Sequence, residues 1–158
     1  GLCGFRHSTK QIGSKAVLIA ELRAVDAAVR ILHSEHITVI SDSQDAIAMI
    51  EGWMAGQTNL PAGYTTARAD GQPAGLVAAQ RRLHAQQDRI TLSWVKSHHG
   101  HPLNEGADAL ARLARRYAAG ADDLTAAEYQ RRAAGLAEAF AAEFRRTQRS
   151  EVPLPLAR

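Results

Sequence analysis

The chain has 158 residues, of which 46% are hydrophobic, enough for the core of one domain. Aromatic residues are sparse at 5%, which favours a helix-rich or mixed fold. Cys3 is its only cysteine, which excludes an internal disulfide framework and fits a reducing compartment. We find no apolar run that could span a membrane and recognise no signal peptide, so we expect a cytoplasmic monomer. Its formal charge of +3 permits a polyanionic partner without requiring one.

The first part of the chain alternates strand-like and helix-like segments. Residues 2–6 predict a strand, and the β-branched run over residues 36–41 predicts a covered parallel strand. Residues 16–33 predict a helix because apolar residues recur there at helical spacing: Leu18, Leu22, Val25, Val29 and Leu32. Ser43 is placed to cap a further helix over residues 44–53.

Turn-forming residues mark the middle of the chain. Glycines, prolines and polar residues predict a loop over residues 54–73, followed by a helix over 74–87 and a strand over 90–95. A histidine-rich loop with Gly100 and Pro102 ends that strand, and Asn104 is the predicted N-cap of the next helix. The residues expected to face the core from this helix are Leu103, Ala107, Leu110, Ala114 and Tyr117.

The end of the chain predicts a second, amphipathic helix of about five or six turns. Thr125 and Glu128 have the spacing of a capping box. The apolar stripe consists of Tyr129, Ala133, Leu136, Phe140 and Phe144, and we expect it to dock on the domain rather than to form a membrane or nucleic-acid arm. We therefore divide the chain into an α/β domain (1–119), a helical extension (120–149) and a proline-containing tail or linker (150–158).

Three acidic residues on separate elements are candidates for a functional site. Glu21 lies on the flank of an apolar helix stripe, where it is either a salt-bridged rim residue or a ligand pointing into a site. Asp42 follows a strand at its carboxyl end, where ligands bind in open α/β sheets. Asp108 lies in or near the first turns of a helix, where the helix dipole favours a carboxylate.

The chemistry of these acids points to hard divalent cations, because Mg²⁺ prefers oxygen ligands. Converging carboxylates can hold two such ions, which together favour phosphodiester hydrolysis. A zinc site is the weaker alternative, because His98, His99 and His101 share one turn and no cysteine accompanies them.

At these residues the sequence resembles the type 1 ribonucleases H. The resemblance rests on Ala20-Glu21-Leu22, on Ser41-Asp42-Ser43-Gln44 and on WVKSHHGHPLNEGADALA, which begins at Trp94, and it covers roughly residues 1–119. It implies an α/β ribonuclease H-like fold in which helices flank a central mixed sheet. It also implies hydrolysis of the RNA strand of RNA–DNA hybrids with two Mg²⁺ ions, or Mn²⁺ in their place.

The resemblance also implies roles for single residues. Glu21, Asp42 and Asp108 match three of the family's four metal-binding acids, and His98 matches a mobile histidine that assists proton movement and product release. Gln44 matches a residue that contacts the hybrid. With it, Ser43 and Lys96 are the expected substrate-binding residues.

The sequence departs from the family in places that bear on activity. The family's first acid lies on a strand upstream of Gly1, so we expect an N-terminal strand to be missing from this chain and the fragment to cleave little by itself. Val17 and Leu18 replace a pair of asparagines that bind the hybrid in many members. Arg68 is the only lysine or arginine in residues 56–75, where many members carry a basic protrusion.

Two rival interpretations remain open from the sequence. One is a catalytically impaired ribonuclease H-like module that binds nucleic acid or a protein, which loss of the first acid would produce. The other is a different nuclease or transposase of the same broad fold, which would share the acids but not the segment that begins at Trp94.

Overall fold

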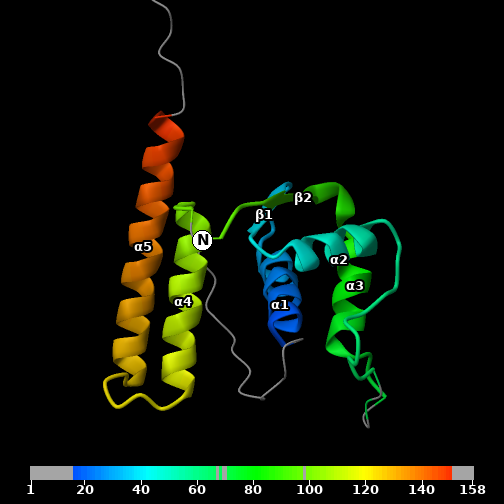
Figure 1. The fold of residues 1–158 in the computed structure, drawn as a ribbon, viewed down its shortest axis with the longest axis horizontal. Coiled ribbons are helices and arrows are strands. Elements are labelled where there is room, and N and C mark those ends of the chain that lie inside the picture. The colour runs from blue at the N-terminus through cyan, green and yellow to red at the C-terminus, as the bar shows by residue number, and fades with distance from the viewer. Residues whose placement is uncertain (1–15, 67, 69–70, 98, 151–158) are drawn as a thin grey trace, which may run out of the picture. The chain divides into compact units, whose positions relative to one another are not determined.

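The computed structural model describes residues 16–66, 68, 71–97 and 99–150 (Figure 1). These residues belong to two compact units that meet in sequence between Val95 and Lys96. We call the described residues up to Val95 the sheet unit and those from Lys96 the helical unit, and each is described by itself.

The sheet unit alternates helices and strands in the order that the sequence predicts: α1 (Ala16–Ile31), β1 (Ile37–Ser41), α2 (Gln44–Met54), α3 (Gly75–Ala85) and β2 (Ile90–Trp94). A short 3₁₀ turn over Gln87–Arg89 leads into β2. Among the described residues, β1 and β2 form a parallel pair, with a register that runs from Ile37 opposite Ile90 to Ser41 opposite Trp94. Because the strands are parallel, their carboxyl ends lie at the same edge.

The core of the sheet unit lies between the two strands and their helices. The largest fully buried side chains come from the three helices: Leu22, Val29, Ile50, Trp53, Leu76 and Leu83. Ile37 and Ile90, paired across the strands, are buried in the same cluster. The apolar stripe predicted for α1 is thus confirmed, with Ile19 added to it.

The helical unit is a hairpin of α4 (Pro102–Ala118) and α5 (Ala126–Ser150), which lie side by side in Figure 1. Tyr117 near the end of α4 stacks on Tyr129 near the start of α5, with ring centroids 4.6 Å apart. At the other end the His101 and Phe144 rings have centroids 6.0 Å apart, so the two helices run antiparallel. The apolar stripe of α5 therefore packs on α4.

The structure corrects several local predictions for α4. The helix begins at Pro102 with His101 as its N-cap residue, so the prediction that Asn104 caps it is wrong. Proline suits this first position because the N–H that it lacks has no helical partner there. Of the predicted stripe, Leu110 and Ala114 are buried, whereas Ala107 is exposed and Leu113 is buried in its place.

At the start of α5, the predicted capping box forms only in part. The Thr125 hydroxyl accepts a hydrogen bond from the Glu128 N–H at 3.2 Å. The Glu128 carboxylate, however, bonds Arg131 and Arg132 instead of the backbone of Thr125. The strand predicted for residues 2–6 and the tail after residue 150 lie outside the described residues.

Candidate active site

The carboxyl end of β1 is a tightly bonded corner that carries Asp42. The hydroxyl of Ser41 accepts a hydrogen bond from the Ser43 N–H at 3.1 Å, and the hydroxyl of Ser43 caps α2 through the Ala46 N–H at 3.2 Å. The Val95 N–H donates to the Ser41 carbonyl at 3.0 Å, which ties the corner to the end of β2. The backbone on both sides of Asp42 is therefore fixed.

Trp94 adds a contact to this corner that sequence reasoning missed. Its indole Nε1 donates to the backbone carbonyl of Asp42 at 3.1 Å, although 48% of the residue is exposed. A half-exposed tryptophan at a strand end is unusual for a residue whose role is core packing. The parallel register, which places Trp94 opposite Ser41, is the signal that could have identified the contact.

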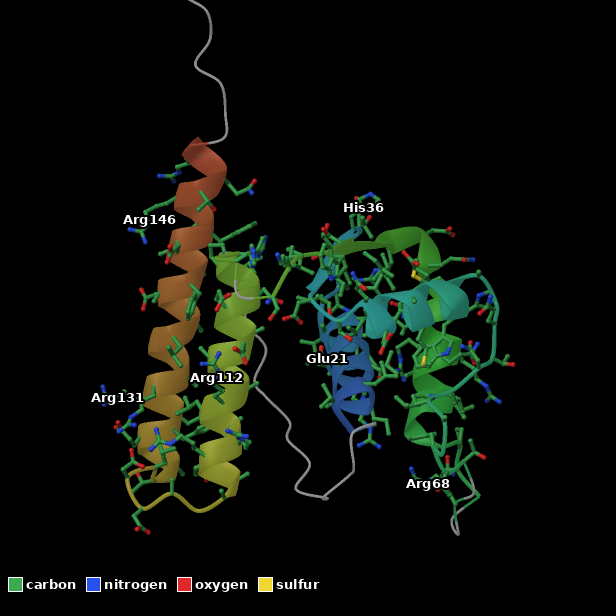
Figure 2. All side chains as sticks on the ribbon, in the orientation of Figure 1. Glu21, His36, Arg68, Arg112, Arg131 and Arg146 are labelled. Atoms are coloured by element: carbon green, nitrogen blue, oxygen red, sulfur yellow. The ribbon has the colours of Figure 1, made fainter. Side chains whose placement is uncertain are left out.

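Glu21, which Figure 2 labels on α1, interacts electrostatically with Asp42 at this corner. Burial raises the pKa of the Glu21 carboxyl above its usual range, and the negative charge of Asp42 raises that pKa further. Glu21 is half-buried and forms no ion pair among the described residues. Asp26, on another face of α1, is the residue that pairs with Arg82.

Within the sheet unit, the negative charge of Asp42 thus disfavours the ionised form of Glu21. A bound cation would favour the ionised form of Glu21, because its charge offsets that of Asp42. Carboxylate oxygens are the donors that Mg²⁺ prefers, so Glu21 and Asp42 fit such an ion. Within the described part of either unit, no three His, Cys, Asp or Glu side chains form a metal-binding group.

Asp108 belongs to the helical unit and lies in the second turn of α4, beyond the first-turn acid Glu105. The dipole argument made from the sequence therefore weakens, because that effect falls off within the first turn. Its carboxylate instead accepts a hydrogen bond from Arg112, one turn further along the helix. The side chain remains 39% exposed, so it stays accessible to another ligand.

The other predicted site residues occupy different surroundings. Gln44 is exposed as the first residue of α2, and Ser43 has its hydroxyl engaged in the cap of that helix. Lys96 is exposed at the start of the helical unit. His98 lies outside the described residues, while His99 next to it has its Nδ1 2.9 Å from the Ser97 carbonyl.

His101 is the N-cap residue of α4 and adjoins the histidine-rich loop. Its ring packs toward Phe144 of α5, and its buried Nδ1 has no hydrogen-bond partner among the described residues. Its backbone carbonyl accepts the Glu105 N–H at 3.0 Å, which begins the hydrogen-bonding of α4. The residue therefore joins the histidine-rich loop to α5 through packing.

These observations define an α/β protein with a carboxylate pair at the carboxyl end of a parallel strand. The RNase H family model matches residues 5–116 of the chain. Among curated proteins, the ribonuclease H of Ruegeria sp. (strain TM1040) is 38% identical over 97 residues, which are 60% of this chain and 57% of that protein. The ribonuclease H of Ruegeria pomeroyi is 35% identical over 113 residues, or 70% of this chain and 67% of the relative.

The chain belongs to the RNase H family, which confirms the predicted family and its α/β fold. A third relative, the ribonuclease H of Agrobacterium fabrum, is 39% identical over 95 residues, which cover 58% of this chain and 62% of the relative. The chain spans about three fifths of the length of several of these curated relatives. No solved structure matches it significantly. Within the described ranges, no helix has both the length and the apolar character needed to cross a membrane.

Proposed function

We propose that the protein is a metal-dependent endonuclease that hydrolyses the RNA strand of RNA–DNA hybrids. The observation that carries this proposal is the carboxylate pair of Glu21 and Asp42, which lies inside the stretch matched by the RNase H family. The names of the curated relatives, all ribonuclease H, support the same activity.

In this proposal Glu21, Asp42 and Asp108 are the residues that hold Mg²⁺, or Mn²⁺ in its place. Two bound ions would activate a water molecule and stabilise the leaving oxygen of the phosphodiester. The corner at Ser41 and Ser43, with the Trp94 indole, fixes the backbone of Asp42 so that its carboxylate is held ready before the substrate arrives.

The remaining residues of the proposed site act on the substrate. Ser43, Gln44 and Lys96 bind the hybrid, Lys96 as a point charge for a phosphate. His98 takes up or releases a proton at an imidazole nitrogen, because the ordinary pKa of histidine lies near neutral pH. Like the metal assignment, these roles come from the match of each residue to the family's motifs.

The test is cleavage of a hybrid with a labelled RNA strand by the protein expressed from its complete gene. Cleavage should require Mg²⁺ and stop in chelator. Asp42→Asn should abolish it, since this change removes a ligand charge while keeping the side-chain shape. Asp45→Asn is the matched control, because Asp45 is an exposed acid in the first turn of α2.

The outcomes separate the two interpretations. Full activity in Asp42→Asn would refute the assignment of the site. Tight hybrid binding by the unmutated protein, without cleavage in either metal, would favour the catalytically impaired module instead.

A further inference from the structure

Arginines near the connection of α4 and α5 form more ion pairs with acids than those at the C-terminal end of α5 do. Near the connection of α4 and α5, Arg116 binds Asp123 at 2.8 Å, and Arg131 binds Glu128 at 2.7 Å. Arg132 bonds both of these acids. The hydrogen bonds from Arg131 and Arg132 lower the pKa of Glu128 to about 2, so the positive charge at this end is largely balanced by acids.

The opposite end of α5 carries three arginines within five residues. Arg145, Arg146 and Arg149, which we call the C-terminal arginine cluster, are all exposed. Arg146 forms an ion pair with Glu143 at 4.0 Å, while Arg145 and Arg149 form no ion pair among the residues that the structure describes. At about 100° per residue, all three lie away from the stripe that packs on α4.

The packing of the hairpin decides what lies beside this cluster. The contact of Phe144 with His101 places the C-terminal end of α5 next to the start of α4 and the loop before it. That loop contains the exposed residues Lys96 and His99. Figure 2 shows Arg131 and Arg146 toward opposite ends of α5, so the cluster lies at the same end of the hairpin as the loop.

We propose that the C-terminal arginine cluster binds backbone phosphates of the nucleic acid and extends the substrate surface from the Lys96 loop onto α5. This inference rests on the proposed function for the identity of the ligand. Exposed guanidinium groups such as those of Arg145 and Arg149 match phosphate geometry well. An anionic membrane fits less well, because α4 already covers the apolar stripe that an interfacial helix would insert.

Nothing in the match to the family assigns this role, since α5 begins after residue 116. Contacts of this kind are independent of base sequence and position the duplex without reading it. The cluster should therefore raise affinity for any duplex of suitable shape, with a strong dependence on salt.

The experiment measures binding of a fluorescent RNA–DNA hybrid in chelator by anisotropy, at salt concentrations between about 50 and 200 mM. The test variant is Arg145→Gln with Arg149→Gln. The matched control, Arg115→Gln with Arg131→Gln, removes the same charge from exposed arginines toward the other end of the hairpin. A third variant, Arg145→Lys with Arg149→Lys, keeps the charge.

The test variant should bind less tightly at low salt, with a log–log salt slope shallower by about one for each phosphate that it no longer binds. Over this fourfold change in salt, each such phosphate should reduce the difference in affinity between the unmutated protein and the test variant by about fourfold. The control should keep the unmutated slope, and the lysine variant should keep most of it. Melting temperatures check that all variants fold.

Three results would overturn the inference. They are an unchanged slope in the test variant, an equal change in the control, and loss of binding to phosphatidylserine vesicles with unchanged hybrid binding. Absence of hybrid binding by the unmutated protein would overturn it as well. The proposed function fails separately, in the cleavage assay, because the binding assay contains no metal and requires no turnover.

Discussion

Gly106 allows α5 to approach α4, and replacing it with alanine tests this packing directly. Gly106 is buried in the second turn of α4 without a positive φ, so its backbone tolerates alanine. An added Cβ would lie 2.9 Å from both Cβ and Cγ of Phe140. Real Cβ atoms almost never approach so closely, so the rigid base of the Phe140 side chain must shift.

Two opposing effects set the magnitude. Alanine gains about 1 kcal/mol over glycine in a helix interior. Overpacking against a neighbour that cannot move freely costs about 1–3 kcal/mol. We expect a net loss of about 1 kcal/mol in the free energy of unfolding, or a fall of about 2–4 °C in melting temperature.

Gly135 of α5 offers the matched control. It is exposed, and an added Cβ there would meet no atom within 4 Å. Gly135→Ala should therefore stabilise by about 1 kcal/mol, and the difference between the two variants isolates the clash. The assay is urea denaturation followed by circular dichroism.

A suppressor completes the test. In a Phe140→Gly background both of the close atoms, Cβ and Cγ, are gone, so Gly106→Ala should become neutral or stabilising, with a coupling between the two sites. If Gly106→Ala stabilises the unmutated protein as much as Gly135→Ala does, the close approach of α5 to α4 is not what the structure indicates.

Three further predictions concern the proposed site. Glu21→Gln should abolish cleavage and raise the melting temperature at neutral pH, because the raised pKa of Glu21 makes its ionised form unfavourable in the folded protein. The gain in melting temperature should vanish as pH falls below 4.5, where the carboxyl is protonated in both the folded and the unfolded state. A lower melting temperature of the variant at pH 7 would contradict this. Trp94→Phe keeps a ring but removes the bond to the Asp42 carbonyl, so the melting temperature should fall only slightly, by the worth of one hydrogen bond, about 1 kcal/mol, and turnover should fall several-fold; equal turnover would show that the bond does not position Asp42. His98→Ala should lower kcat by about 100-fold at unchanged hybrid affinity, with His99→Ala as the neighbouring control, and equal losses in both variants would deny His98 its specific role.

Periodicity predicted the elements of the sheet unit well, because those helices bury one regular stripe. Leu22, Val25 and Val29 are buried as predicted, and β1 and β2 match the predicted strands to within a residue. The α/β class follows from the same alternation. What periodicity could not provide is the contact between Trp94 and Asp42, which depends on the register of two strands far apart in the chain.

The start of α4 shows where local rules conflict. Asn104 is a good N-cap residue, and Pro102 is a good first residue of a helix, so the sequence supports two starting points. The helix begins at Pro102, and this earlier start places Asp108 further from the helix end. The ion pair with Arg112, one turn along, is a common local contact that the spacing could have suggested.

Of the candidate site, the sequence placed Asp42 by its position after a strand, and Glu21 by its isolation on a stripe flank. The interaction between these two carboxylates needed the tertiary structure, since it joins α1 to the end of β1. Which acids bind metal remains a prediction from the family match, and the Asp42→Asn experiment tests it for Asp42.

Helix α5, which lies beyond the stretch matched by the RNase H family, packs on residues inside that stretch. The RNase H match ends at residue 116, yet the residues that receive α5 lie inside that match: His101, Gly106, Leu113 and Ala114. Leu113 and Ala114 are buried in a cluster that α5 completes, so α4 has an apolar face whose cover comes from beyond the matched stretch. His101 lies between the histidine-rich loop and Phe144. A change in α5 that loosens this packing would therefore act on the loop that carries His98, without altering any residue of the proposed site.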